Sequence, residues 1–174
     1  IIQIRENEFL AYYSDHSITR SERILNMIRL IMRRGLNAIT IKDRYRYVHR
    51  RIGIAKIKIL GASKWSIEVH RYQNNPLLHL NGSWGDWNES LFCPGCLKIE
   101  DYYYLIPTAS TYSIGFPYKQ YVGLIKSRSP FFEQVLDKRI LIDGPAERLS
   151  VMPSARSQLA FDTPSPILMD KEER

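Results

Sequence analysis

The sequence contains little cysteine and no long hydrophobic run. Both cysteines, Cys93 and Cys96, stand in one Cys-Pro-Gly-Cys stretch, so they provide no disulfide framework and suit a reducing compartment better than secretion. The longest apolar stretch, from Ile24 to Met32, is interrupted by polar residues and is far shorter than a membrane-spanning helix. The chain also starts without the charged and apolar leader of a signal peptide. We predict a protein with no spanning helix that is intracellular or intravirion, and the sequence does not determine the compartment further.

The common signatures of nucleotide-binding and hydrolytic enzymes are missing as well. The chain contains no GxxxxGK[ST] phosphate-binding loop, GxGxxG fingerprint, HExxH metal-binding helix or GxSxG nucleophile elbow. Acid-base pairs such as Asp15 with His16 and Glu68 with His70 are close in sequence, and such pairs are more often turns or surface contacts than catalytic sets. The carboxylates that a metal-dependent nuclease would have to bring together are Glu68, Asp86, Glu89, Glu100 and Asp101. We predict a non-enzymatic protein and keep a nuclease as an alternative.

Basic residues are strongly concentrated in the first third of the chain. Between Arg20 and Lys58 there are nine arginines and three lysines against two acids, Glu22 and Asp43, which leaves ten net positive charges in thirty-nine residues. The formal charge of the whole chain is +7, so the remainder is slightly acidic. A one-sided charge of this size indicates a polyanionic partner, an anionic membrane surface or an acidic protein.

The arginines of this segment are suited to binding phosphate. A guanidinium group donates two parallel hydrogen bonds to phosphate oxygens, and regular elements would fix the spacing of several such groups. Tyr45 and Tyr47 share the parity of Ile39 and Ile41, so we expect them to face the core rather than to stack on bases. Binding to the phosphate backbone, with little reading of bases, is therefore predicted. The residues predicted to contact nucleic acid are Arg20, Arg23, Arg29, Arg33, Arg34, Lys42, Arg44, Arg46, Arg50 and Arg51.

The first part of the basic segment has the pattern of a helix. Thr19 and Glu22 have the spacing of a capping box and Gly35 is a typical stop signal, which together predict a helix over 20–34. Its apolar residues recur at helical spacing, so they are predicted to face a core. They are Ile24, Leu25, Met27, Ile28, Ile31 and Met32.

Alternation of apolar and polar residues predicts strands in much of the remainder. The alternating runs cover 37–48, 52–60 and 64–72. The aromatic run within 97–106 favours another strand, and further strands are predicted over 111–116, 120–126 and 139–143. The parity of the isoleucines changes within the second run, which predicts a bulge near Ala55. Short helices are predicted at 6–13 and, after Ser129 and Pro130 as cap and first turn, at 130–138.

Together these elements predict an α+β fold, in which an N-terminal helix packs on a mainly antiparallel sheet and a short second helix lies near 130–138. A single domain is predicted over 1–145, with its basic part at 20–58. Residues 146–174 carry several prolines and serines without a sustained period, so they are predicted to form an extended tail.

The cysteine pair leaves three interpretations open. Cys93 and Cys96 across a Pro-Gly turn are half of a zinc site, but tetrahedral zinc needs two more ligands, and His70 and His79 stand at no standard spacing. The pair also fits a redox couple or a plain turn with small buried thiols. No cofactor is predicted, and zinc at Cys93 and Cys96 remains the alternative.

The sequence thus predicts an RNA-binding structural component of a ribonucleoprotein, either ribosome-like or a viral core. Its partners would be nucleic acid, with RNA the first choice, and other proteins of the assembly reached through the C-terminal tail. The alternatives are a viral matrix-like protein that self-associates on an anionic membrane, and the nuclease named above. A matrix-like protein would use the same basic surface, since near-surface Lys and Arg are attracted to acidic lipids.

Overall fold

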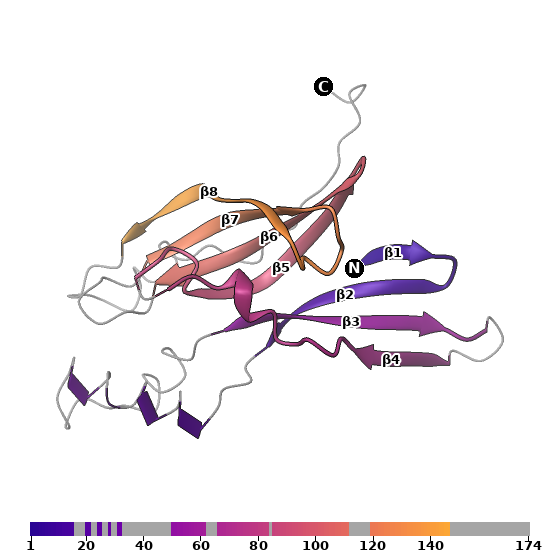
Figure 1. The fold of residues 1–174 in the computed structure, drawn as a ribbon, viewed down its shortest axis with the longest axis horizontal. Coiled ribbons are helices and arrows are strands. Elements are labelled where there is room, and N and C mark those ends of the chain that lie inside the picture. Colours follow the sequence, from indigo (N-terminus) through magenta and orange to yellow (C-terminus); the bar gives the residue numbers. More distant parts are fainter. Residues whose placement is uncertain are drawn as a thin grey trace, which may run out of the picture.

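The structure is a computed structural model that describes residues 1–15, 20–21, 24–25, 28, 31–32, 50–61, 66–83, 85–111 and 119–146, with 144–146 described through the backbone alone. Within these ranges the chain forms two antiparallel four-stranded sheets, which lie one above the other in Figure 1. The first sheet contains β1 (Ile2–Arg5), β2 (Glu8–Asp15), β3 (Arg51–Ile59) and β4 (Ile67–Arg71). The second contains β5 (Ser90–Ile99), β6 (Tyr102–Thr111), β7 (Lys119–Ser127) and β8 (Val135–Ala146). Neighbouring strands follow one another in sequence, so each sheet is a meander.

The hydrophobic core lies where the two sheets face each other. A 3-10 turn, η2 (Leu78–Leu80), contributes to it from the connection between the sheets. The ten buried residues of the core cluster are Leu10, Ile52, Ile54, Leu77, Leu80, Leu91, Leu105, Ala109, Ile125 and Phe132. Because each sheet supplies apolar side chains from one face of its strands, neither sheet can bury that face without the other.

Strand β5 connects the two sheets directly, since it packs against β2 and β3. The amide of Leu91 donates to the carbonyl of Arg50 at 2.9 Å, just before β3 begins. The amide of Cys93 donates to Ser14 Oγ at 2.8 Å, near the end of β2. These two hydrogen bonds fix the edge of the second sheet on the ends of the central strands of the first sheet.

The loop between β7 and β8 closes the core from one side. Phe132 is fully buried and lies edge-on to Tyr12, with ring centroids 6.0 Å apart. The hydroxyl of Tyr12 donates to the carbonyl of Pro130 at 2.8 Å, and His79 Nε2 donates to the carbonyl of Phe132 at 2.7 Å. Outside the core, Phe131 stacks on Tyr72 at 4.8 Å. A loop of the second sheet is thereby held on residues that belong to the first sheet and η2.

The predicted α+β class is wrong for the part of the chain that the structure describes. No described helix reaches seven residues, and the strands form two sheets rather than one sheet under a helix. Of the helix predicted over 20–34, positions 20–21, 24–25, 28 and 31–32 are described; they are helical, but most of their apolar side chains are exposed rather than packed on a sheet. The segment predicted as a helix at 6–13 falls mostly in β2, where backbone pairing with β1 and β3 prevails over its short helical pattern.

The helix predicted at 130–138 is also wrong. Ser129 Oγ accepts from the amide of Phe131 at 3.2 Å, as in a capping interaction, but the hydrogen bonding closes a tight turn, with the amide of Phe132 bonded to the carbonyl of Ser129. Phe132 then has a φ of 55°, which ends any helical path, and β8 begins at Val135. Burial of the Phe132 ring in the core outweighs the local helical signal.

Two strand predictions need smaller corrections. The pairing of β2 with β3 runs without interruption from Glu8 opposite Lys58 to Asp15 opposite Arg51, so the bulge predicted near Ala55 is absent. The change of parity instead reflects burial on both faces in the first half of β3. The single strand predicted over 97–106 is two strands, because the chain reverses at 100–101 between β5 and β6.

The strand predicted over 120–126 is confirmed as the interior of β7, and that over 139–143 lies within β8. The strand predicted over 37–48 lies outside the described residues. The division into a domain at 1–145 and a tail at 146–174 stays a prediction.

Candidate nucleic-acid interface

Arg50 and Arg51, the last two residues of the predicted phosphate-binding set, are packed into the fold at the start of β3. Arg51 is only 7% exposed. The guanidinium of Arg50 lies over the ring of Phe92 at 4.8 Å, and its Nε is buried without a hydrogen-bond partner. The backbone of Arg50 is engaged as well, since its amide donates to Ser90 Oγ at 2.9 Å. Arg50 therefore helps to join the start of β3 to β5, and Arg51 is buried opposite Asp15 of β2.

The two lysines of β3 lie beside carboxylates. Lys56 Nζ is 3.0 Å from Glu8 Oε1, and this contact lowers the pKa of Glu8. Lys58 lies directly between Glu8 on β2 and Glu68 on β4 in the sheet register. The cations at the end of the basic segment are thus partly balanced by acids on the neighbouring strands.

The remaining predicted contacts lie toward the start of the basic segment. Arg20 is exposed and helical. The structure does not bring it together with Arg50 or Arg51 by any contact among the described residues. The other predicted residues, Arg23, Arg29, Arg33, Arg34, Lys42, Arg44 and Arg46, lie outside the described residues.

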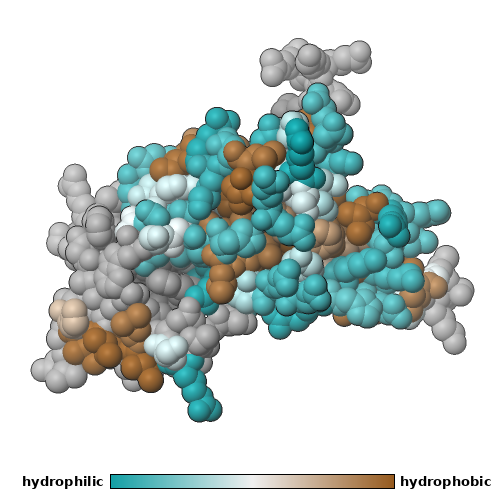
Figure 2. All heavy atoms as spheres, viewed as in Figure 1, coloured by the Kyte–Doolittle hydropathy of each residue, from teal (hydrophilic) through white to brown (hydrophobic). Residues whose placement is uncertain are grey.

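The described helical positions of this segment expose apolar side chains. Ile24 is 61% exposed and Met32 is 71% exposed, and Leu25 and Ile28 are also on the surface. Figure 2 shows these hydrophobic residues as brown spheres at the lower left, where Figure 1 draws the indigo helical fragments. The predicted burial of this stripe is therefore wrong for the residues that are described, and the stripe is available to a partner.

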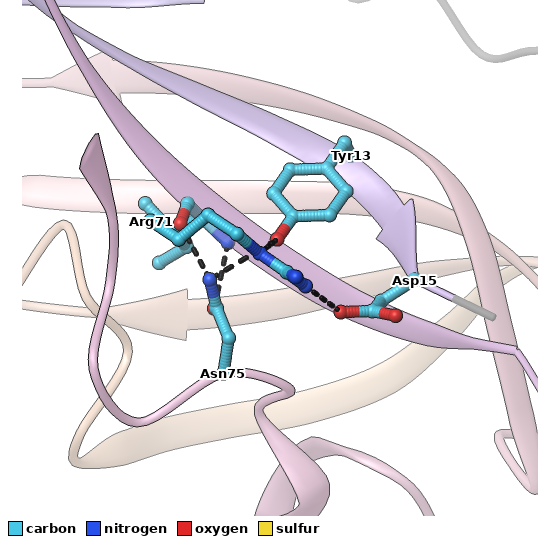
Figure 3. A network of polar contacts seen from close by, with 5 residues as sticks. Tyr13, Asp15, Arg71 and Asn75 are labelled. Carbon is cyan, nitrogen blue, oxygen red and sulfur yellow. Dashed lines mark hydrogen bonds and ion pairs between the residues drawn. The ribbon is translucent and has the colours of Figure 1, made fainter. Parts of the chain in front are cut away.

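A separate cation, Arg71 at the end of β4, is bound to residues of β2 although its side chain is 63% exposed. Its Nη2 is 2.8 Å from Asp15 Oδ2, and its Nε donates to the hydroxyl of Tyr13 at 3.0 Å. Asn75 Nδ2 also donates to Tyr13, at 3.2 Å, and to the carbonyl of Ile54. Figure 3 shows the guanidinium of Arg71 lying between Tyr13 and Asp15. The hydrogen bond with Tyr13 and the negative charge of Asp15 raise the pKa of Arg71. The network of Arg71, Tyr13, Asp15 and Asn75 connects β2, β3 and β4.

Sequence reasoning missed a cluster of tyrosines and cations on the second sheet. Lys126 Nζ lies 3.8 Å from the ring centroid of Tyr102 and 5.5 Å from that of Tyr104. The guanidinium of Arg128 lies 5.8 Å from the ring of Tyr102. The run Tyr102-Tyr103-Tyr104 indicated only a strand, because the partner cations are more than twenty residues away and the register of β6 with β7 is needed to place them.

The cysteines lie at a bulge in β5. The register of β5 with β6 shifts between Phe92 and Gly95, and Cys93 has a φ of 48°. Both thiols are free, and burial raises the pKa of Cys96 to about 12. Among the described residues, no three His, Cys, Asp or Glu side chains come together as a metal ion would require. Zinc at Cys93 and Cys96 stays a prediction without added support.

The carboxylates considered for a nuclease are dispersed among the described elements. Glu68 contacts His70 at 3.6 Å on the exposed strand β4, Asp86 accepts from the amide of Ser83, and Glu89 is buried after η2. Glu100 and Asp101 lie in the turn between β5 and β6. Among the described residues, no set of carboxylates comes close enough together to bind the metal ion that the nuclease alternative requires.

Comparison with known proteins adds no assignment. No protein-family model, curated protein or solved structure matches the chain. The interpretation as a viral component therefore has no relative to support it and is not carried further. Within the described ranges, no helix has the length and apolar character needed to cross a membrane.

Proposed function

We propose that the protein is a non-enzymatic RNA-binding component of a ribonucleoprotein, which contacts the phosphate backbone through its arginine-rich segment at 20–46. The observation that carries the proposal is the charge of this part of the chain. Residues 20–46 contain seven arginines and one lysine against two acids. A net charge of six in twenty-seven residues favours a polyanion, since the counterions released from nucleic acid drive such binding.

The contacts of Arg50 and Arg51 narrow the proposed surface. Arg51 is buried and Arg50 lies on Phe92, so both are assigned to the fold rather than to the partner. The proposed phosphate contacts are therefore those nearer the start of the segment, Arg20, Arg23, Arg29, Arg33, Arg34, Lys42, Arg44 and Arg46. The two sheets then act as the scaffold that anchors both ends of the segment, at the end of β2 and the start of β3.

The salt dependence of RNA affinity tests the proposal. If about six cations contact phosphate, log K should fall against log salt with a slope near −4 for single strands and −5 for duplex, from roughly 0.7 to 0.9 per contact. Replacing Arg29, Arg33 and Arg46 by Gln should reduce the single-strand slope by about 2. Fluorescence anisotropy with a labelled oligoribonucleotide provides the affinities.

The matched control removes the same charge from cations that are already ion-paired, in the variant K56Q/K119Q/R139Q. Its slope should stay close to that of the unmodified protein, because paired cations release few counterions. An affinity that does not change with salt, or equal effects of the two triple variants, would contradict the proposal.

The exposed apolar stripe favours a second candidate, a peripheral protein of anionic membranes. Ile24, Leu25, Ile28 and Met32 are exposed on helical positions among many arginines. Helices with this composition insert their apolar face at the boundary of head groups and acyl chains. Each basic residue near an acidic surface adds on the order of 1 kcal/mol.

Vesicle flotation separates the two candidates. Vesicles with about a third phosphatidylserine should retain the protein if the membrane candidate holds, and I24Q/M32Q should release it while leaving RNA affinity unchanged. If the protein binds RNA but does not bind these vesicles, the membrane candidate is excluded and the RNA proposal remains.

A further inference from the structure

At the end of the second sheet where β6 begins and β7 ends, one face carries two half-buried tyrosines under two cations. Lys126 contacts the rings of Tyr102 and Tyr104, and Arg128 contacts the ring of Tyr102. Three of these residues lie on strands and are half-buried: Tyr102, Tyr104 and Lys126. Arg128 follows β7 directly and is exposed. We call these four residues the tyrosine platform.

The sheet register places the platform on one face. Tyr104 pairs directly with Lys126 across β6 and β7, so their side chains leave the sheet on the same side. Tyr103 points the other way and packs against the core. On β5, Leu97 lies opposite Tyr104 and Ile99 opposite Tyr102, which adds an aliphatic border to the two rings.

The cations of the platform carry no ion pair among the described residues, unlike Lys119 and Arg71, which also lie over tyrosines. Lys119 lies over Tyr121 at 5.3 Å but is bound to Asp143 at 2.6 Å, and Arg71 is bound to Asp15. Asp137 lies opposite Lys126 in the register, yet its carboxylate is engaged by Arg139 at 3.4 Å. Lys126 and Arg128 therefore keep their charge for a ligand while holding it over aromatic rings.

We propose that the tyrosine platform binds unpaired bases of single-stranded RNA. The bases stack on Tyr102 and Tyr104 in the place that Lys126 Nζ occupies in the free protein, and Lys126 moves from the rings to the adjoining phosphates, which Arg128 also contacts. Aromatic rings on a sheet beside unpaired cations are the arrangement by which proteins hold single strands without sequence preference. Duplex RNA cannot use the rings, because its bases are already stacked and paired. Glu100 and Asp101 in the neighbouring turn repel phosphate, so the strand passes on the β7 side of the rings.

The platform goes beyond the proposed function, because it adds base stacking at a second surface to backbone contacts of the arginine-rich segment. It is tested with the full chain and two probes, a labelled twelve-nucleotide oligouridine and an RNA duplex of the same length. The variant Y102L/Y104L keeps apolar volume and removes the aromatic faces. Its affinity for oligouridine should fall about ten- to a hundredfold, from the usual effect of losing a stacked base, while duplex affinity stays unchanged. The control Y102F/Y104F should bind as the unmodified protein does.

The variant K126Q/R128Q provides a second measurement that does not depend on the folding of Y102L/Y104L. Lys126 is half-buried and Arg128 is exposed, so replacing them should leave the core intact. Its single-strand salt slope should become shallower by about 1.4, at roughly 0.7 per phosphate contact, whereas K56Q/K119Q should change it little. Unchanged oligouridine affinity in both platform variants overturns the platform. The platform is also overturned if these variants lose affinity for single-stranded and duplex RNA equally. It is likewise overturned if they lose binding to acidic vesicles instead of binding to oligouridine.

The two ideas fail separately. If the unmodified protein binds oligouridine with a steep salt slope and the platform variants bind equally well, the platform is wrong and the arginine-rich contact stands. If the salt slope of oligouridine binding is only about 1.4, as two phosphate contacts give, and binding is lost in Y102L/Y104L, the platform stands and the backbone proposal is wrong.

Discussion

Replacement of Phe132 by Ala tests how the two sheets are joined. The ring is fully buried in the core cluster and meets Tyr12 edge-on at 6.0 Å, although it comes from a seven-residue connection between β7 and β8. Its removal takes away the transfer free energy of the ring and leaves a cavity between the sheets. For a buried Phe this sum is about 3–5 kcal/mol. The free energy of unfolding, measured in urea by far-UV circular dichroism, should fall by that amount with little change in slope.

The neighbouring Phe131 provides a matched control. It stacks on Tyr72 but is only half-buried, so F131A should cost less than half as much as F132A. A destabilisation of F132A below about 1 kcal/mol would refute the reasoning, because a surface or loosely packed ring costs no more than that. Equal effects of the two variants would likewise show that Phe132 does not fill the core between the two sheets.

Two further predictions concern the exposed stripe and the buried thiol. I24Q and M32Q should each change the free energy of unfolding by less than about 0.5 kcal/mol, because both side chains are exposed; a loss of 2 kcal/mol in thermal or urea unfolding would place them in a core instead. Cys96, whose pKa burial raises to about 12, should resist iodoacetamide at pH 8 in the folded protein and react in urea, as read by mass spectrometry. Since the unfolded thiol ionises from about 9.0, stability should also decline as pH rises from that value toward 12, and rapid labelling of the native thiol would contradict the burial.

Strands with regular alternation and strong pairing partners could be predicted from the sequence. β4 is an example, because Ile67 and Val69 alternate with Glu68 and His70, and the predicted strand over 64–72 contains the observed one. The first half of β3 was harder, since Ile52 to Ala55 are buried on both faces and so lose the alternation on which the prediction rests. Burial on two faces depends on what packs above and below a strand, and that information is not local.

The helical predictions failed where tertiary burial decides the conformation. Ser129 and Pro130 carry a true local signal, and the Ser129 hydroxyl does accept a backbone hydrogen bond. The buried ring of Phe132, however, determines the path of the chain two residues later. The reversal between β5 and β6 was missed for a related reason, because Glu100 takes a φ of 52° that glycine or asparagine would normally mark.

The candidate site was predicted from charge alone, and charge alone does not say which cations remain available. Lys56, Arg71, Lys119 and Arg139 each contact a carboxylate of the same molecule, so binding a phosphate would require them to leave that partner. Such an exchange releases few counterions and contributes little to affinity or its salt dependence. Lys126 and Arg128 contact rings rather than a carboxylate within the part of the chain that the structure describes, although neither stands in the basic segment. A count of net charge does not distinguish Lys56, which is paired with Glu8, from Lys126, which lies over tyrosine rings. The cross-strand register separates the two, and sequence patterning does not reveal that register.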